Sequence, residues 1–278
     1  MNKRLPLSRV TEVSAKAAPV VVCGVVALAL AACGGSNTPS NVVAPGAKEG
    51  VKTQALETGA ALLQSRPPVE ALNAYLDGFH FYNGRPEEQM EAHHYCAIVN
   101  DELIQCVVYD GNAKDAKLMG VEYIVSERLF RTLPDTERKL WHSHVHEVKS
   151  GQLIAPGIPQ AAEHELMKKL ISTYGKTFHT WHTDRQKELP LGVPQLMMGF
   201  TSDGMASSEM VSARDRRFGV DSAEKRKNRE DIVAPPVATG ADAWQRGQVM
   251  QIQDPTSGDA QHHLQSGKDA PRIPPAPK

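Results

Sequence analysis

Apolar and polar residues alternate along three consecutive stretches in the first half of the chain. The stretches cover residues 91–98, 103–109 and 118–125. Because successive side chains of a strand point to opposite faces, this period of two predicts three half-buried strands that follow one another as an antiparallel meander. The same pattern predicts strands at residues 141–149, 176–184 and 194–204.

Other stretches repeat their apolar residues every three or four positions, which is typical of amphipathic helices. Residues 48–65 and 159–174 follow this pattern, and Gly175 is placed to end the second helix. Pro67-Pro68 predicts the start of another helix, which we extend to Asp77-Gly78. Strands and helices together predict an α+β domain over residues 50–218, with a mainly antiparallel sheet flanked by helices.

The two ends of the chain have a different composition. Residues 1–16 carry four basic side chains, and residues 17–32 carry no charge, which is the pattern of a signal peptide over residues 1–32. Residues 33–49 are rich in Gly, Ser, Asn and Pro and predict a flexible tether. Residues 219–278 contain few large apolar side chains and predict a disordered, Pro-rich tail.

The end of the apolar leader, Leu30-Ala31-Ala32-Cys33, resembles the lipobox of bacterial lipoproteins. This resemblance implies that Cys33 is acylated and becomes the first residue of the mature protein. Acyl chains hold a protein on a bilayer, so the membrane is the expected partner. Gly34 stands where an Asp would retain a lipoprotein in the inner membrane, and we therefore expect the outer membrane of a bacterial cell envelope.

The charge of the chain is balanced, with 31 Lys and Arg against 32 Asp and Glu and a formal net charge of −1. A protein that binds nucleic acid through phosphates needs a positive surface. We therefore do not expect a nucleic acid partner.

Two cysteines remain for the folded domain, because Cys23 leaves with the signal peptide and Cys33 takes the lipid. Cys96 and Cys106 flank the predicted turn at Asn100-Asp101-Glu102, and a three-residue loop would place them opposite each other on two strands. An exported protein can form a disulfide there. The alternative is a pair of buried reduced thiols, and the residues do not decide between the two.

Nine of the eleven histidines lie between residues 80 and 182. If residues 141–149 form a strand, its alternate histidines share one face, and clustered imidazoles can bind a metal ion. The candidate ligands are His142, His144, His179, His93 and His94. His93 and His94 are adjacent on a strand, so only one of them can join a given site.

The His142-Ser143-His144 pattern is similar to the metal-binding motif of cupins, but it lacks their later glutamate, because Glu147 follows His146 directly. The simpler interpretation is that the histidines hydrogen-bond to the main chain of a polar strand face. We favour this interpretation, in which the protein needs no cofactor. If the histidines instead form a site, the expected cofactor is a divalent metal ion.

Several segments together resemble the DUF1264 family, whose best-known members are the plant oil-body-associated proteins. The segments include DGFHFY at residues 77–82, EAHHYC at 91–96, GVEYIVS at 120–126 and YGKTFH at 174–179. The resemblance covers residues 50–205 and implies no established catalytic residues. The positions that match the family's motifs are His80, His93, His94, Cys96, Cys106, Glu122, His142, His144, His179 and Gln195.

These observations predict a membrane-anchored envelope lipoprotein whose domain is non-enzymatic and contacts a lipid or protein partner. The alternative hypothesis is a metal-dependent enzyme or metal-binding protein with a site built from histidines.

Overall fold

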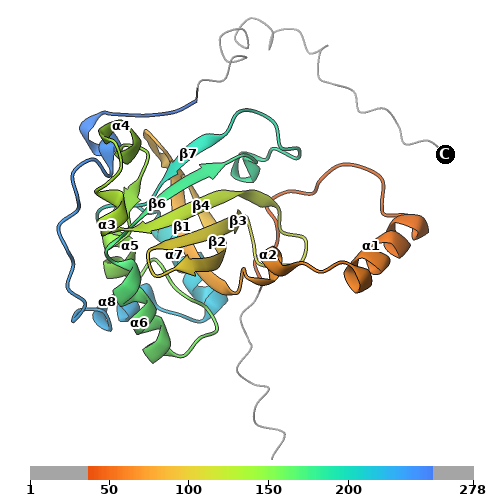
Figure 1. Ribbon diagram of the computed structural model, residues 1–278, viewed down its shortest axis with the longest axis horizontal. Helices are drawn as coiled ribbons and strands as arrows, with labels where there is room; N and C mark the ends of the chain where they lie inside the picture. Colours follow the sequence, from red (N-terminus) through yellow and green to blue (C-terminus); the bar gives the residue numbers. More distant parts are fainter. Residues whose placement is uncertain (1–36, 253–278) are drawn as a thin grey trace, which may run out of the picture. The chain divides into compact units, whose positions relative to one another are not determined.

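The computed structural model describes residues 37–252 (Figure 1). The predicted signal peptide, Cys33 and residues 253–278 of the predicted tail lie outside the described residues. Between residues 37 and 252, no helix has both the length and the apolar composition needed to cross a bilayer.

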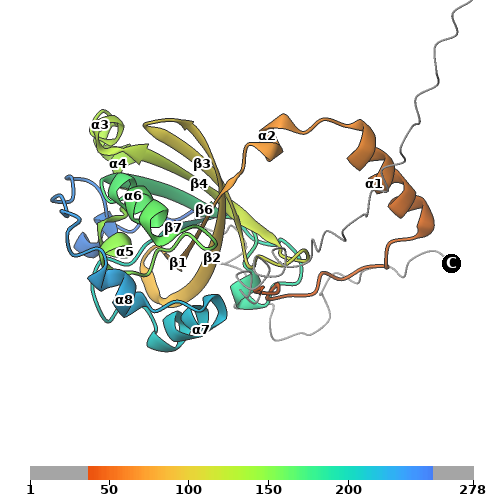
Figure 2. The ribbon, with the colours of Figure 1, turned by 90° about the horizontal axis from the view of Figure 1, so that it is seen from below.

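The described strands form one antiparallel sheet that closes into a barrel (Figures 1 and 2). They are β1 (Ala74–Tyr82), β2 (Arg85–Asn100), β3 (Leu103–Tyr109), β4 (Leu118–Ser126), β5 (His142–Ser143), β6 (Thr173–His179) and β7 (Gln195–Met198). Their order is β4-β3-β2-β1-β7-β6-β5, and the additional pairing of β4 with β6 closes the barrel. The short strand β5 shares one edge of β6 with β7.

The helices flank the barrel, so the predicted α+β fold with an antiparallel sheet is confirmed. They are α1 (Val51–Leu63), α2 (Pro67–Glu70), α3 (Glu127–Phe130), α4 (Asp135–Arg138), α5 (Val145–Ser150), α6 (Gln160–Leu170), α7 (Ser208–Phe218) and α8 (Ser222–Lys227). Figure 2 shows α5, α6 and α8 grouped on one side of the barrel. No residue of α1 is buried.

The barrel interior has an apolar part and a polar part. The apolar part is a cluster of inward side chains with residues of α5 and α6, namely Leu76, Cys96, Ile104, Cys106, Ile124, Val148, Met167 and Leu170. Next to it, three buried polar residues, His80, His94 and Glu122, also project inward from β1, β2 and β4. The helices α5 and α6 therefore cover the apolar part, and the polar part is enclosed by the strands.

Cys96 and Cys106 are paired across β2 and β3 and form a disulfide. The predicted three-residue loop is not present, because Asn100 pairs with Leu103. An irregularity between Ile98 and Asn100 restores the pairing register, so the two cysteines still face each other.

The predicted helix from Pro67 to Gly78 is wrong beyond its first turn. Helix α2 ends at Glu70, and strand β1 begins at Ala74. Residues 76–82 of β1 are all buried, because one face lines the barrel and the other packs under α7 and its neighbours. Burial on both faces removes the apolar–polar alternation that identifies a strand.

The predicted strand over residues 141–149 is also wrong. Only His142 and Ser143 pair with β6, and helix α5 begins at Val145. The predicted helix over residues 159–174 ends at Leu170, and Gly175 lies within strand β6 instead of ending the helix.

The ordered body extends beyond both predicted boundaries. Before residue 50, Val42 is buried, the Thr38 amide donates to Asn112 Oδ1 at 2.6 Å, and the Asn112 amide donates to the Thr38 carbonyl at 3.0 Å. After residue 218, Arg229 is buried and donates to the carbonyls of Val148 and Leu153, both at 2.9 Å. The part of the chain that packs therefore includes residues that we expected to belong to the tether and the tail.

A buried ion pair joins α7 to the outer face of β1. Arg214 Nη1 lies 2.7 Å from Asp77 Oδ1, and both side chains are fully buried. Arg214 also donates to the carbonyl of Gln152 at 2.7 Å. Burial alone would raise the pKa of Asp77, but its hydrogen bond to His93 and the charge of Arg214 hold that pKa below its usual value.

We expect Arg214→Met to lower the free energy of unfolding by about 3–5 kcal/mol, because it leaves the Asp77 carboxylate buried without its cation. Urea unfolding followed by circular dichroism would measure this change. Arg216→Met, on the same helix but exposed, is the matched control and should change the free energy of unfolding by less than about 0.5 kcal/mol. Equal effects of the two variants would contradict the assigned role of the buried pair.

Candidate metal centre

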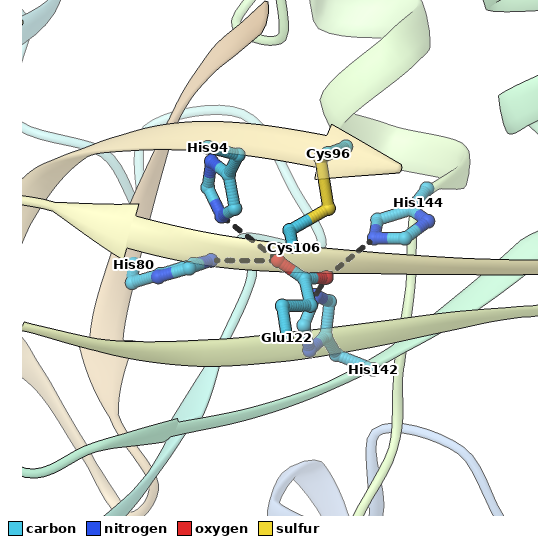
Figure 3. Close-up of a disulfide and its surroundings, with 7 residues drawn as sticks. All are labelled: His80, His94, Cys96, Cys106, Glu122, His142 and His144. Atoms are coloured by element: carbon cyan, nitrogen blue, oxygen red, sulfur yellow. Dashed lines mark hydrogen bonds and ion pairs between the residues drawn. A yellow bond between two sulfur atoms is a disulfide. The ribbon is translucent and has the colours of Figure 1, made fainter. Parts of the chain in front are cut away.

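Four imidazoles surround the carboxylate of Glu122 inside the barrel (Figure 3). Glu122 lies on β4 and is 2% exposed. The distances from its carboxylate oxygens to the Nε2 atoms of the histidines are 2.8 Å for His94, 3.2 Å for His144, 3.5 Å for His142 and 3.7 Å for His80. The four histidines come from β1, β2, β5 and the residue that precedes α5, so the barrel brings together positions far apart in the sequence.

Glycines make room for the central carboxylate. Gly175 on β6 pairs with His142, and a Cβ atom at Gly175 would collide with Glu122 Oε1 and with the His142 ring. Gly199 has the same relation to Glu147, whose carboxylate lies where a Cβ atom of residue 199 would be. We expected Gly175 to end a helix. It is a glycine instead because the site leaves no room for a side chain there.

The proton of His144 is fixed by its neighbours. Thr173 Oγ1 donates to the carbonyl of Leu170 at 2.7 Å, so it can only accept at its 2.8 Å contact with His144 Nδ1. In the neutral imidazole the proton is then on Nδ1, and Nε2 presents a lone pair. This lone pair faces Glu122 Oε1, which is also an acceptor. Two acceptors in contact need a cation between them, either a proton or a metal ion.

Other buried nitrogens at the site lack hydrogen-bond partners within residues 37–252. They include Nδ1 of His94 and both ring nitrogens of His142. His179 does not face the carboxylate, because its Nε2 lies 3.3 Å from Nδ1 of His80. It therefore orients His80 and is not itself one of the groups around Glu122.

Burial and the central negative charge act in opposite directions on the protonation of these groups. Burial alone would raise the pKa of Glu122, but the imidazoles of His142, His144 and His94 around the carboxylate outweigh it and hold that pKa well below its usual value. Burial would lower the pKa of His142, but the nearby Glu122 raises it to about 9. Burial lowers the pKa of His179 to about 3. The site therefore combines an ionised carboxylate with a set of imidazoles.

A small cavity of about 20 Å³ adjoins the site. Its polar lining consists of His80, His94, Glu122, His144 and Glu147. Apolar side chains complete it, among them Leu76, Phe79, Ile124, Leu153 and Leu170. The volume suffices for about one water molecule and excludes an organic substrate.

The structure brings together three of the histidines that the sequence nominated, namely His94, His142 and His144. His93 points to the outer face of the barrel, where its Nδ1 lies 2.7 Å from the Tyr75 hydroxyl and 3.1 Å from Asp77 Oδ2. Asp77, Glu91 and His93 also lie close enough to hold a cation, but Arg214 and Arg217 already supply positive charge there.

Two members of the site were missed as ligand candidates, Glu122 and His80. Both match motifs of the family resemblance, but the spacing of the histidines gave no reason to add them. A signal was present in the alternation of β4, where Glu122 occupies an inward position between Gly120 and Ile124. A lone carboxylate at a core position needs a compensating partner.

Comparison with known proteins gives one family. The DUF1264 profile, described as a protein of unknown function, matches residues 66–233. Oil body-associated protein 1B of Arabidopsis thaliana is 42% identical over 222 residues, which cover 78% of this chain and 92% of the relative. Oil body-associated protein 1A of Zea mays is 40% identical over 225 residues, which cover 79% and 94%. No solved structure matches the chain.

The profile spans more than half of the chain, and the relatives align over nearly their whole length. The residues that the profile matches include Glu122 and the four histidines around it. The protein therefore belongs to the DUF1264 family.

Proposed function

We propose that the barrel binds a divalent transition-metal ion at Glu122. The observation that carries this proposal is the contact between Glu122 Oε1 and a His144 Nε2 atom whose lone pair is directed at it. A divalent ion bound between them would satisfy both acceptors and would offset the charge of the buried carboxylate. Imidazole and carboxylate donors suit zinc, iron, copper and nickel ions.

The competing interpretation is a hydrogen-bond network in which protonated imidazoles neutralise Glu122. It accounts for one positive charge beside one negative charge, but the Nε2 atoms of His94 and His142, which face Glu122, make no hydrogen bond in the described part of the chain. Buried polar groups without partners cost about 1–3 kcal/mol each. Metal binding uses the Nε2 atoms that face Glu122, so we favour it over the network.

We expect Glu122→Gln to reduce the affinity for zinc or cobalt by more than about tenfold, since even residues that only support metal ligands contribute about 10–100-fold. Elemental analysis of the full chain, purified without a polyhistidine tag, would measure the bound metal. Titration of the metal-free protein, followed by its melting temperature, would measure the affinity. A bound ion should raise stability by about 2.7 kcal/mol at a hundredfold excess over its Kd.

Glu163→Gln is the matched control, because Glu163 is equally buried but lies outside the barrel, where it contacts Lys225 and Arg229. This control should lose stability and keep its metal. A wild-type protein that contains no metal and whose melting temperature does not respond to zinc, cobalt, manganese, iron or copper would refute the proposed metal centre.

We also propose that acylated Cys33 anchors the barrel to the bacterial outer membrane, with the domain close to a lipid surface. The lipobox-like sequence before Cys33 supports the anchor. The names of the relatives associate those proteins with oil bodies, which supports a lipid surface as the neighbour of the domain here.

We expect Cys33→Ser to move the protein from the membrane fraction to the soluble fraction, because the alkylated thiol is the attachment point of the acyl chains. Cell fractionation followed by immunoblotting would measure the distribution. Cys23→Ser is the control, since this cysteine precedes the cleavage site, and the variant should remain with membranes. A Cys33→Ser protein that still sediments with membranes would contradict the anchor.

A further inference from the structure

The two oxygens of Glu122 divide the surrounding imidazoles into two pairs. Oε2 faces His94 at 2.8 Å and His80 at 3.7 Å. Oε1 faces His144 at 3.2 Å and His142 at 3.5 Å. Figure 3 shows the pairs approaching the carboxylate from different strands, with each oxygen directed toward its own pair.

From this division we infer that Glu122 bridges two divalent metal ions. One ion is bound by His80, His94 and Oε2, and the other is bound by His142, His144 and Oε1. The inference rests on the proposed metal centre. It adds the number of metal ions and the residues that bind each of them. Each ion would have two imidazoles and one carboxylate oxygen from the protein, which leaves coordination positions open for a further ligand.

The distances between the donors favour two ions over one. The donor atoms of His80, His94 and Glu122 all lie within 4.8 Å of one another, and so do those of Glu122, His142 and His144. Ring centroids are closer within the pairs, at 4.9 Å for His80 and His94 and 5.1 Å for His142 and His144, than between His80 and His142, at 6.0 Å.

A metal–nitrogen bond of about 2.0–2.1 Å keeps the donors of one ion within about 4.2 Å of each other. Small movements within either triad satisfy this limit, because its donors are already close. Two-metal sites hold their ions about 3.5–4 Å apart, and a carboxylate can supply one oxygen to each ion.

A second carboxylate lies beside the pair formed by His142 and His144. Glu147 Oε2 is 3.9 Å from His144 Nε2, and Glu147 is 7% exposed. Two divalent ions bring more positive charge than Glu122 alone offsets, and a second buried carboxylate at this position would offset part of the remainder. Glu147 therefore lies beside the second ligand set, where its negative charge would stabilise the second ion.

The cavity identifies the class of ligand that the open positions can take. His80 and His94 of the first pair and His144 of the second pair all line it, so a ligand in the cavity reaches both ions. Its volume of about 20 Å³ holds one water molecule. The ligand is therefore a single oxygen donor, water or hydroxide, placed between the two ions.

The test is a stoichiometric titration of the metal-free full chain with cobalt ions, followed by visible absorption and by elemental analysis after desalting. We expect two equivalents for the wild type, one for His94→Ala, one for His144→Ala and none for the double variant. His164→Ala is the control, because His164 is on the surface of α6 and contacts Asp231; it should bind two. His94→Gln and His144→Gln repeat the comparison with a smaller change in volume.

Magnetic coupling gives a second readout. Manganese ions bridged by a carboxylate and one oxygen ligand interact, so the wild type should give a spin-coupled electron paramagnetic resonance spectrum. Each single variant should give the spectrum of an isolated ion.

One equivalent in the wild type, or a single variant that loses all its metal, would overturn the two-ion site and leave the proposed metal centre standing. No binding by the wild type would overturn both.

Discussion

The structure depends on one constraint, which is the burial of a carboxylate inside a closed barrel. Glu122 is almost without solvent, and its charge must be offset by neighbours that the strands deliver. Four imidazoles surround the carboxylate, and each comes from a separate position in the sequence. Glycines at positions 175 and 199 leave the volume that these side chains and Glu147 occupy. The local features around the site therefore follow from one buried charge.

The barrel can meet this constraint because its other interior positions provide rigidity. Cys106 pairs with Glu122 across β3 and β4, and its disulfide to Cys96 joins β3 covalently to β2. Apolar residues from α5 and α6 fill the adjoining space. His179 contacts Nδ1 of His80, the ring nitrogen that does not face Glu122. Two of the four imidazoles are therefore held from behind, His80 by His179 and His144 by Thr173.

The sequence predicted the meander of β2, β3 and β4, because these strands have one exposed and one buried face. It also predicted that Cys96 and Cys106 face each other on neighbouring strands. It predicted further that His93 and His94 cannot both belong to the same site. It did not reveal β1, where burial on both faces hides the alternation, and it misassigned residues 144–149 as strand.

The composition of the site was only partly accessible from the sequence, for a physical reason. His142 and His144 were nominated because they are close in the chain, whereas Glu122 and His80 reach the same point only through the strand order β4-β3-β2-β1 and its closure through β6. Pairings between distant strands leave no local pattern. Gly175 shows the same limitation, since its neighbour Glu122 is more than fifty positions away.

The size of the cavity at Glu122 separates this barrel from those that carry lipids as cargo. Such carriers keep an acyl chain in the lumen, which requires a volume of several hundred cubic ångströms. Here the space beside the cluster holds about 20 Å³, imidazoles and carboxylates occupy the polar part of the lumen, and the disulfide and apolar side chains fill the rest. A hydrocarbon chain cannot share that compartment. Any lipid that this protein meets must therefore contact its exterior, so substitutions in the inner cluster and on the outer surface can accumulate independently of each other.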